Sequence, residues 1–112
     1  MAILGIDLGT SSVKVIVLDI QGRTLSASKA DYEVMAPHAG WAESDPGEWW
    51  TATLSAVQAA LAQVPHVKIT AIGLSGQMHG VVLTDKEGQP IRSALLWADT
   101  RAEAELARYQ AL

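Results

Sequence analysis

Apolar and polar segments alternate with short turns along the first third of the chain, which predicts a set of antiparallel strands. Two apolar runs, Ile3 to Ile6 and Val13 to Leu18, flank a small, hydroxyl-rich bend, as in a β-hairpin. Gln21-Gly22 marks a second tight turn, and the more polar stretch from Thr24 to Val34 predicts a third strand at a sheet edge. The segment from Pro37 to Gly40 interrupts the pattern and predicts a loop.

The clearest helix signal begins at Asp45. This residue type caps helices, Pro46 suits the first helical position, and Glu48 follows three residues after Asp45. Pro65 predicts the end of the helix, and interspersed alanines keep it slim enough to lie closely on a sheet. Apolar residues at alternating spacings of four and three predict its buried stripe: Trp50, Leu54, Val57, Leu61 and Val64.

The second half of the chain predicts further strands and one more helix. Residues 68–75 are short, apolar and bounded by turn signals, so they predict a buried strand. The helical crossover before them favours parallel pairing with the first strand. Strands are also expected at 81–84 and 91–97, joined by a turn at 85–88, and a last helix from Thr100 or Arg101 to Leu112. The order β-β-β-α-β-β-β-α is an α/β layout of the ribonuclease-H type around a mixed sheet.

Composition narrows the possible functions. The chain has 112 residues, of which 49% are hydrophobic, enough for one core and roughly one domain. Its net charge of −4 and the lack of a basic cluster give no electrostatic footprint for nucleic acid. The absence of cysteine excludes disulfides and thiolate metal sites. No apolar run approaches the ~20 residues that span a bilayer, so a soluble, cytoplasmic protein with no membrane partner is expected.

The bend of the first hairpin is a candidate phosphate site. Backbone N–H groups and hydroxyls in such a turn can converge on an anion, and a carboxylate at the strand end could hold hydrated Mg²⁺ beside it. The alternative is an ordinary hairpin, because Asp is common wherever strands end in turns. The bend matches neither a Walker A loop nor a dinucleotide-binding fingerprint. The residues of the candidate site are Asp7, Gly9, Thr10, Ser11, Ser12 and Lys14.

A second polar cluster follows the predicted strand at 68–75. Two glycines flank Gln77, Met78 and His79, so the backbone is free to turn sharply and present these side chains. If the strands at 68–75 and 91–97 share one sheet, their ends lie on a common cleft. A pocket with an indole, an imidazole, a carboxylate and a guanidinium suits a polyhydroxylated ligand. The alternatives are a His bonded only to backbone and an Asp–Arg pair that caps the last helix. The other residues of this candidate site are Trp97, Asp99 and Arg101.

Four ordered motifs carry a family resemblance that covers essentially the whole chain. GIDLGTSSVK, GWAESDPGEWW, GLSGQMHG and LLWADTR resemble the N-terminal part of the sugar kinases that include xylulokinase, gluconokinase and glycerol kinase. The resemblance implies the actin-like, ribonuclease-H-like ATPase fold, with two such domains around an active-site cleft. It also implies transfer of the γ-phosphoryl group of ATP to a sugar or polyol hydroxyl, with Mg²⁺.

The resemblance assigns roles to individual positions. It implies that Asp7 lies near the metal and the transferred phosphoryl group, that the hairpin and Lys14 face the nucleotide phosphates, and that Met78 and His79 contact the sugar. Glycerol kinases carry an Arg-Glu pair at those last two positions, so this chain departs from them. The sequence SGQMHG is most similar to xylulokinases, which favours D-xylulose over gluconate or ribulose.

The resemblance also implies that parts of the enzyme lie outside these 112 residues. The general-base Asp, the second phosphate motif and the adenine site belong to later segments of the family's chains, so this chain is expected to be the leading portion, alone inactive, of a longer kinase. A homodimer of the full-length enzyme is left open. The rival of another class is a non-catalytic actin-like module that binds nucleotide or a partner protein.

Overall fold

The computed structural model describes all 112 residues, which form two compact units. Residues Met1–Glu33 and Gly47–Gln77 form the first, called here the sheet unit, and Val34–Pro46 and Met78–Leu112 form the second, called the clamp unit. Neither helix has the length and apolar character needed to cross a membrane.

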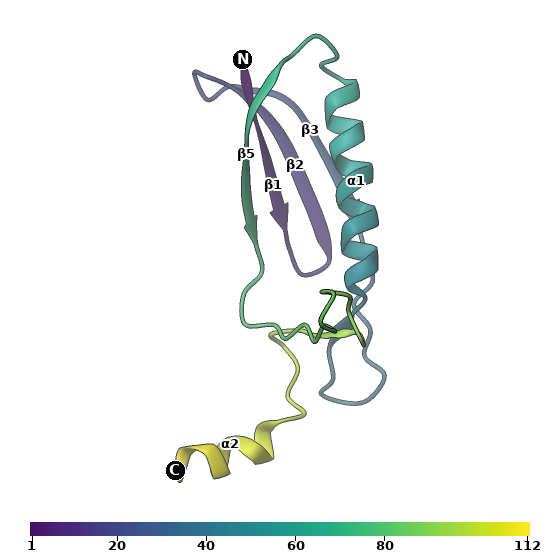
Figure 1. Ribbon diagram of the computed structural model, residues 1–112, viewed down its shortest axis with the longest axis vertical. Coiled ribbons are helices and arrows are strands. Elements are labelled where there is room, and N and C mark those ends of the chain that lie inside the picture. The colour runs from purple at the N-terminus through teal and green to yellow at the C-terminus, as the bar shows by residue number, and fades with distance from the viewer. The chain divides into compact units, whose positions relative to one another are not determined.

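A four-stranded mixed sheet is the framework of the sheet unit (Figure 1). Its strands lie in the order β3 (Thr24–Asp31), β2 (Ser12–Asp19), β1 (Ala2–Leu8) and β5 (Ile69–Gly76). The first three are antiparallel neighbours, and β1 pairs with β5 in parallel. The hairpin, the third strand at a sheet edge and the parallel crossover predicted from the sequence are confirmed. The third strand ends at Asp31 rather than Val34.

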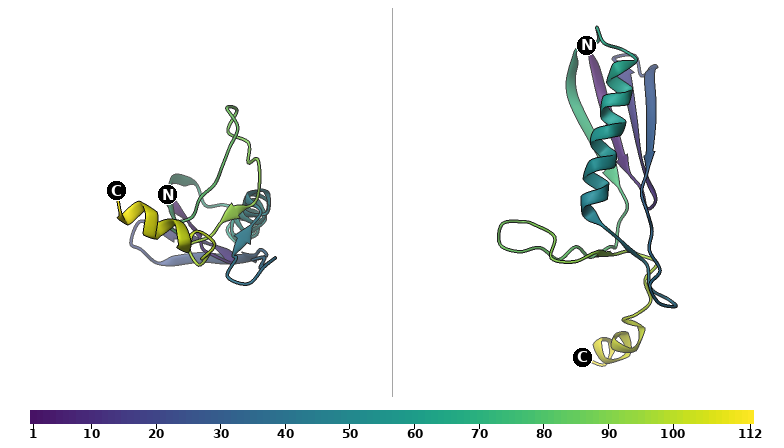
Figure 2. Two further views of the ribbon diagram at one scale, coloured as in Figure 1. Left: turned by 90° about the horizontal axis from the view of Figure 1, so that it is seen from below. Right: turned by 90° about the vertical axis from the view of Figure 1, so that its right-hand side faces the viewer.

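The helix α1 (Pro46–Ala62) covers one face of this sheet (Figure 2). The core between them consists mainly of small and β-branched residues, with relative exposures of 8% or less. Its members include Val13, Val15 and Val17 from β2 and Ala52, Ala56 and Ala60 from α1. Alternate β2 positions therefore face the helix, as a strand's period of two requires.

The apolar stripe predicted for α1 is wrong in its first half. Trp50 and Leu54 are 66% and 43% exposed, whereas the alanine row at spacing four is buried. The reason is close approach: the hydroxyls of Ser26 and Ser28 on β3 donate to the carbonyls of Ala60 and Ala56 at 2.9 and 2.6 Å. Bulky side chains along that line would hold the helix away from the sheet. The larger residues Val57, Leu61 and Val64 pack at the margin of the core instead.

The strand β5 is exposed, although its sequence predicts a buried strand. Ile72 and Leu74 are 63% and 78% exposed. β5 lies at one edge of the sheet with a strand on one side only, while α1 accepts its hydrogen bonds from β3 at the opposite edge. An apolar run indicates that a strand can be buried. Whether the strand is buried depends on which other elements cover it.

The clamp unit holds less regular structure than the sequence predicts. Its strands β4 (Glu43–Ser44) and β6 (Ala94–Leu95) form a two-stranded sheet. The strand expected at 81–84 is reduced to isolated bridges, including one between Val81 and Leu95, and the strand expected at 91–97 is reduced to β6. The helix α2 (Glu103–Gln110) has no buried residue and no side-chain cap. The sequence pattern overestimated these strands because isolated apolar runs carry no information on their pairing partners.

Candidate functional site

The hairpin between β1 and β2 is closed by backbone hydrogen bonds. The N–H of Gly9 donates to the carbonyl of Ser12 at 2.9 Å, and the N–H of Tyr32 donates to the carbonyl of Ser11 at 3.0 Å. A Cβ at position 9 would lie 3.0 Å from the Ser12 carbonyl oxygen, so the close return of the chain requires glycine there. The Gly-Thr-Ser-Ser bend of the sequence is therefore a tightly held turn.

Tyr32 anchors this hairpin and was missed in the sequence analysis. Its hydroxyl donates to the carbonyl of Gly9, the residue is 8% exposed, and its ring centroid lies 6.4 Å from that of Trp49. Burial raises the pKa of the Tyr32 phenol, and the nearby Asp7 carboxylate raises it further, so the hydroxyl remains a donor at neutral pH. A lone tyrosine after a polar edge strand gives no sequence signal for this role.

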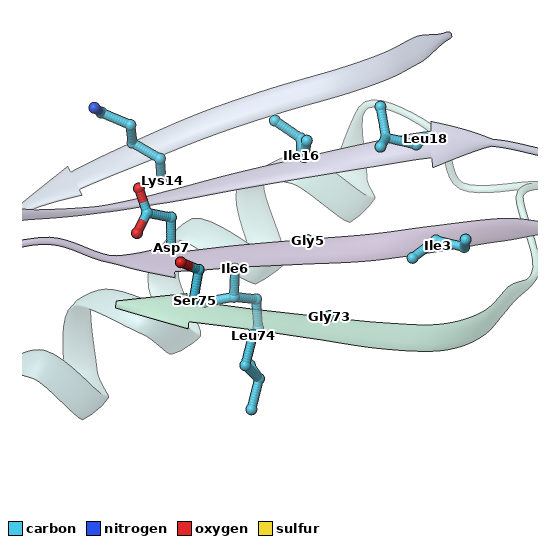
Figure 3. A pocket seen from close by; sticks show the side chains of 10 residues that line it. All are labelled: Ile3, Gly5, Ile6, Asp7, Lys14, Ile16, Leu18, Gly73, Leu74 and Ser75. Atoms are coloured by element: carbon cyan, nitrogen blue, oxygen red, sulfur yellow. The ribbon is translucent and has the colours of Figure 1, made fainter. Parts of the chain in front are cut away.

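Asp7 stands at the end of β1 on the sheet face opposite α1. In the strand register it lies between Lys14 of β2 and Ser75 of β5. Figure 3 shows these three side chains together at one end of a surface pocket of about 530 Å³, with Ile3 and Leu18 toward the other end. Asp7 is exposed, and no side chain or N–H group engages its carboxylate. The Asp7 carboxylate is therefore available to a ligand.

The donor set of the hairpin fits a magnesium–phosphate group rather than a metal held by protein alone. No three His, Cys, Asp or Glu residues are grouped so as to hold an ion. Mg²⁺ needs only one or two protein carboxylates when substrate phosphates and water supply its other ligands. Asp7 provides one such unengaged carboxylate beside the turn, and Lys14 provides a cation on the adjacent strand.

Gln77 directly follows the strand β5, beside the end of β1. Its N–H donates to the carbonyl of Leu8 at 2.8 Å, and a Cβ at Gly76 would lie 3.0 Å from the same carbonyl oxygen. Both polar atoms of the Gln77 amide are shielded from solvent and have no hydrogen-bond partner. Shielded amide atoms are costly to leave unpaired, so this side chain is a candidate for contact with a ligand or a bound water.

Within the clamp unit, the segment containing Met78 and His79 lies next to the segment containing Trp97. β5 and β6 belong to different sheets, so the expectation of one sheet with two adjacent strand ends is wrong. The antiparallel bridge between Val81 and Leu95 nevertheless joins the segment that follows His79 to the segment that precedes Trp97. A Cβ at Gly80 would lie 3.1 Å from the Leu95 carbonyl oxygen. Met78, His79 and Trp97 are all exposed.

The sharp turn in this segment falls on the histidine rather than on its flanking glycines. His79 has φ of 64°, in the left-handed region, whereas neither Gly76 nor Gly80 has a positive φ. Non-glycine residues seldom adopt this conformation, and histidine is among those that do so more often than most. Strained backbone of this kind is frequent at ligand sites.

Asp99 and Arg101 form a closed pair. The Nε and Nη2 atoms of Arg101 donate to Oδ1 and Oδ2 of Asp99 at 2.8 and 2.6 Å, and the N–H groups of Arg101 and Ala42 donate to the same two oxygens at 3.0 and 2.8 Å. The Arg101 guanidinium holds the pKa of Asp99 well below its usual range. Every lone-pair direction of the Asp99 carboxylate is thus occupied. The pair does not cap α2, whose N-cap is Ala102.

Two further residues contact Arg101, and a third contacts one of these two. The guanidinium carbon of Arg101 lies 3.6 Å from the centroid of the Trp41 ring, and Nη2 lies 2.7 Å from Oε1 of Glu43. The same Glu43 oxygen lies 2.5 Å from Nη2 of Arg92. Glu43 is 8% exposed. Sequence reasoning left Trp41 in a loop and did not single out Glu43, because no local sequence pattern marks either residue.

The candidate residues thus gather in two places. The sheet unit brings together Asp7, Lys14 and the hairpin, with Gln77 at the neighbouring strand end. The clamp unit joins the segments of His79 and Trp97 through the bridge between Val81 and Leu95, and it pairs Asp99 with Arg101. Ser11 is exposed, and Gly9, Thr10 and Ser12 are half-buried in the turn.

Comparison with known proteins identifies the family to which the chain belongs. The model of the FGGY family of carbohydrate kinases, N-terminal domain, matches residues 2–112. A xylulose kinase of Escherichia coli (strain K12) is 44% identical over 102 residues, which are 91% of this chain and 21% of that protein. A xylulose kinase of Staphylococcus xylosus is 41% identical over 104 residues, 93% of this chain and 22% of that protein.

A solved structure agrees with these matches. The crystal structure of a xylulose kinase from Brucella ovis superposes with a TM-score of 0.95 and 42% identity over 99% of this chain and 23% of that one. The chain therefore spans about a fifth of the length of the relatives it matches. The actin-like ATPase fold expected from the four sequence motifs is confirmed by these structural neighbours.

Proposed function

Since the chain belongs to the FGGY family of carbohydrate kinases, we propose that it is the N-terminal part of an ATP-dependent kinase that phosphorylates D-xylulose. The γ-phosphoryl group of ATP passes to a hydroxyl of the open-chain ketose, giving D-xylulose 5-phosphate. The observation that carries the proposal is the unengaged Asp7 carboxylate beside a closed, hydroxyl-rich hairpin. Because ATP is the donor, the proposed compartment is the cytoplasm.

The phosphate half of the site consists of residues of the sheet unit. Thr10, Ser11 and Ser12 offer hydroxyls and turn backbone to the phosphates, Gly9 closes the turn through its N–H bond to the Ser12 carbonyl, and Lys14 adds a positive charge. Asp7 would hold Mg²⁺ directly or through water, and the ion would neutralise charge on the transferred group. Phosphoryl transfer depends mainly on such positioning and charge stabilisation, so a carboxylate not bound within the protein suits this task.

The sugar half consists of residues of the clamp unit. His79 and Trp97 lie in the two segments that the bridge between Val81 and Leu95 joins, and they offer a hydrogen-bonding ring and an apolar ring face to the ketose. Met78 lies beside them, and Asp99 and Arg101 complete the wall. The general base that deprotonates the sugar hydroxyl is proposed to lie beyond Leu112.

The choice of D-xylulose rests on the sequence SGQMHG and on the two xylulose kinases described above. Gluconate and ribulose are the alternatives within the family, because gluconokinases can carry the same Met-His pair. A non-catalytic nucleotide-binding module is the alternative of another class. The SGQMHG cluster argues against that class, since a pure assembly module needs no sugar-type pocket.

A grafted enzyme tests the proposal. Residues 1–112 replace the matching first fifth of the Escherichia coli xylulose kinase, and phosphorylation of D-xylulose, D-ribulose, gluconate and glycerol by ATP is measured. The proposal expects D-xylulose to give the highest kcat/KM. A preference for gluconate or ribulose would show that the proposed substrate is wrong. Binding of ATP without phosphorylation of any sugar would favour the non-catalytic module.

Asp7→Asn in the same enzyme tests the phosphate half. It is expected to lower kcat at least about 100-fold, with little change in the affinity for the sugar, because charge stabilisation at the phosphoryl group is lost. Asp31→Asn is the matched control, since Asp31 is an exposed carboxylate whose partner is Lys29 at 2.8 Å. Unchanged turnover in the Asp7 variant would contradict the proposed role of Asp7 in holding Mg²⁺.

A further inference from the structure

The guanidinium of Arg101 has one free edge. Its Nε and Nη2 atoms are both used by the carboxylates of Asp99 and Glu43, and its flat face lies on the ring of Trp41. The remaining nitrogen, Nη1, donates to no residue and is not shielded from solvent. The side chain as a whole is 17% exposed. The Nε and Nη2 atoms and one face of the Arg101 guanidinium are therefore engaged within the protein, and Nη1 is open to solvent.

The Arg101 side chain is restrained by more contacts than an Asp–Arg pair alone would provide. Asp99 alone accepts a two-pronged contact from Arg101, which fixes the plane of the guanidinium. Glu43 adds a second carboxylate to Nη2 at 2.7 Å, and Trp41 fixes the face from one side. An arginine held in this way has lost its rotational freedom before any ligand arrives.

Glu43 also connects the held arginine to the segment of His79. The residues of β4 pair with those of β6, Glu43 opposite Leu95, and Leu95 forms the bridge with Val81. Position 79 lies two residues before that bridge along the chain, and Trp97 lies two residues after it. Arg92, bound to the same oxygen of Glu43 at 2.5 Å, ties a third segment to it. Glu43 thus stands where the backbone ladder and the ion pairs of the clamp unit meet.

We propose that Glu43 and Trp41 are positioning residues that present Nη1 of Arg101 as a preset hydrogen-bond donor to a hydroxyl or carbonyl oxygen of the sugar. The inference rests on the proposed function and deepens it. Neither residue touches the sugar; both act through Arg101. Because the guanidinium is fixed in advance, little side-chain entropy is lost when the sugar binds.

A double-mutant cycle in the grafted kinase separates positioning from simple structural support. Glu43→Gln is expected to raise KM for D-xylulose about tenfold, with kcat and KM for ATP nearly unchanged. Arg101→Lys keeps the charge and loses the planar fork, and is expected to raise KM at least as much. The double variant should then match Arg101→Lys alone, because Glu43 has no guanidinium left to position.

The matched control is Glu87→Gln, the same substitution at an exposed ion-paired glutamate of the same unit, which should leave KM unchanged. Independent, multiplying effects of Glu43→Gln and Arg101→Lys on KM would overturn the inference while leaving the kinase proposal intact. So would a Glu43→Gln variant with the wild-type KM.

A second measurement needs no activity. In the 112-residue chain, the Arg101 guanidinium is expected to give separate Nη1 and Nη2 signals in ¹⁵N–¹H spectra, because its rotation is blocked, whereas exposed Arg108 gives averaged ones. Glu43→Gln and Trp41→Leu should average the Arg101 signals, and Glu87→Gln should not. Unaltered Arg101 signals in both variants would contradict the positioning role, even if the grafted enzyme phosphorylated no sugar and the proposed function failed.

Discussion

The two units of this chain are stabilised by different chemistry. In the sheet unit, buried valines and alanines join α1 to the sheet. In the clamp unit, Ala94 and Leu96 are the buried hydrophobic residues, and the interior also contains Glu43 and Ser44. There the linking contacts are the ion pairs of Glu43, Asp99 and two arginines.

This difference decides how far function and stability can be separated. Asp7 lies on a framework that does not depend on it, so its carboxylate remains free for a ligand. Asp99 and Arg101 are candidate ligand residues and, at the same time, the contacts that join their own segments. A substitution at Asp7 should therefore act on catalysis alone, whereas one at Asp99 should act on both properties.

The largest loss of stability is expected from Ala56→Leu in the sheet unit. Ala56 is 1% exposed, and its carbonyl accepts the Ser28 hydroxyl at 2.6 Å, so a larger side chain must push the helix off the sheet. The free energy of unfolding should fall by about 2–3 kcal/mol, measured by urea denaturation. Ala59→Leu on the exposed side of the same helix should change it by less than about 0.5 kcal/mol. Equal effects would mean that close helix–sheet contact is unimportant.

The clamp unit should show its dependence on charge as a loss of stability in acid. Hydrogen bonds from the Arg101 side chain lower the pKa of Asp99 in the folded state, while the unfolded value is about 4. The stabilisation is thus complete above about pH 4 and is lost as pH falls below it, because the unfolded state takes up the proton first.

Asp99→Asn tests this expectation. Its urea midpoint should lie below the wild-type value at pH 7, and the further loss between about pH 4 and pH 2 should be shallower. Asp19, whose pKa is lowered chiefly by the Arg23 N–H group, contributes to both proteins and cancels in the comparison. Asp31→Asn should keep the wild-type profile. Parallel profiles for Asp99→Asn and wild type would show that the pair is not a source of stability.

A smaller effect is expected where the hairpin depends on one hydroxyl. Tyr32→Phe removes the bond to the Gly9 carbonyl and should lower the free energy of unfolding by about 1 kcal/mol. Tyr109→Phe, at a residue 76% exposed, serves as the control with no expected change. Hydrogen exchange of the Gly9 and Tyr32 amides should accelerate only in the first variant. Protection equal to that of the wild type would show that the turn closes without this anchor.

The smallest effect is expected at Asp7. Asp7→Asn should change the free energy of unfolding by less than about 0.5 kcal/mol, because no residue depends on that carboxylate. Urea denaturation of the 112-residue chain gives the value directly. A loss above about 1 kcal/mol would erase the contrast between the two units and assign Asp7 a structural role.

Much of the sheet unit could be predicted from sequence because its elements follow local rules. The alternation in β2, the Gln21-Gly22 turn, and the proline that begins α1 each act within a few residues. The exposure of Trp50 and Ile72 could not be predicted, since it depends on which elements cover them. The alanine row of α1 was readable as a sign of close packing, but not as the buried stripe itself.

The clamp unit was predicted less well for a physical reason. Its strands are two residues long, too short for a periodic pattern, and its interior is partly polar. Asp99 and Arg101 were identified by residue type, yet their mutual engagement and the part of Glu43 depend on contacts across about 50 positions of chain, such as Ala42 to Asp99. Local patterns do not report such partners.

The left-handed backbone at His79 complicates any redesign of the ligand preference. Replacing this residue alters a ring and a conformational preference together, so a library at position 79 mixes two effects. Asn tolerates the left-handed region, glycine adopts it freely, and β-branched residues do not. A His79→Gly variant would relax the backbone while deleting the imidazole, and His79→Asn would keep a polar group on a tolerated backbone. The pair of variants would separate the contribution of the ring from that of the peptide bend, which a single alanine substitution cannot do.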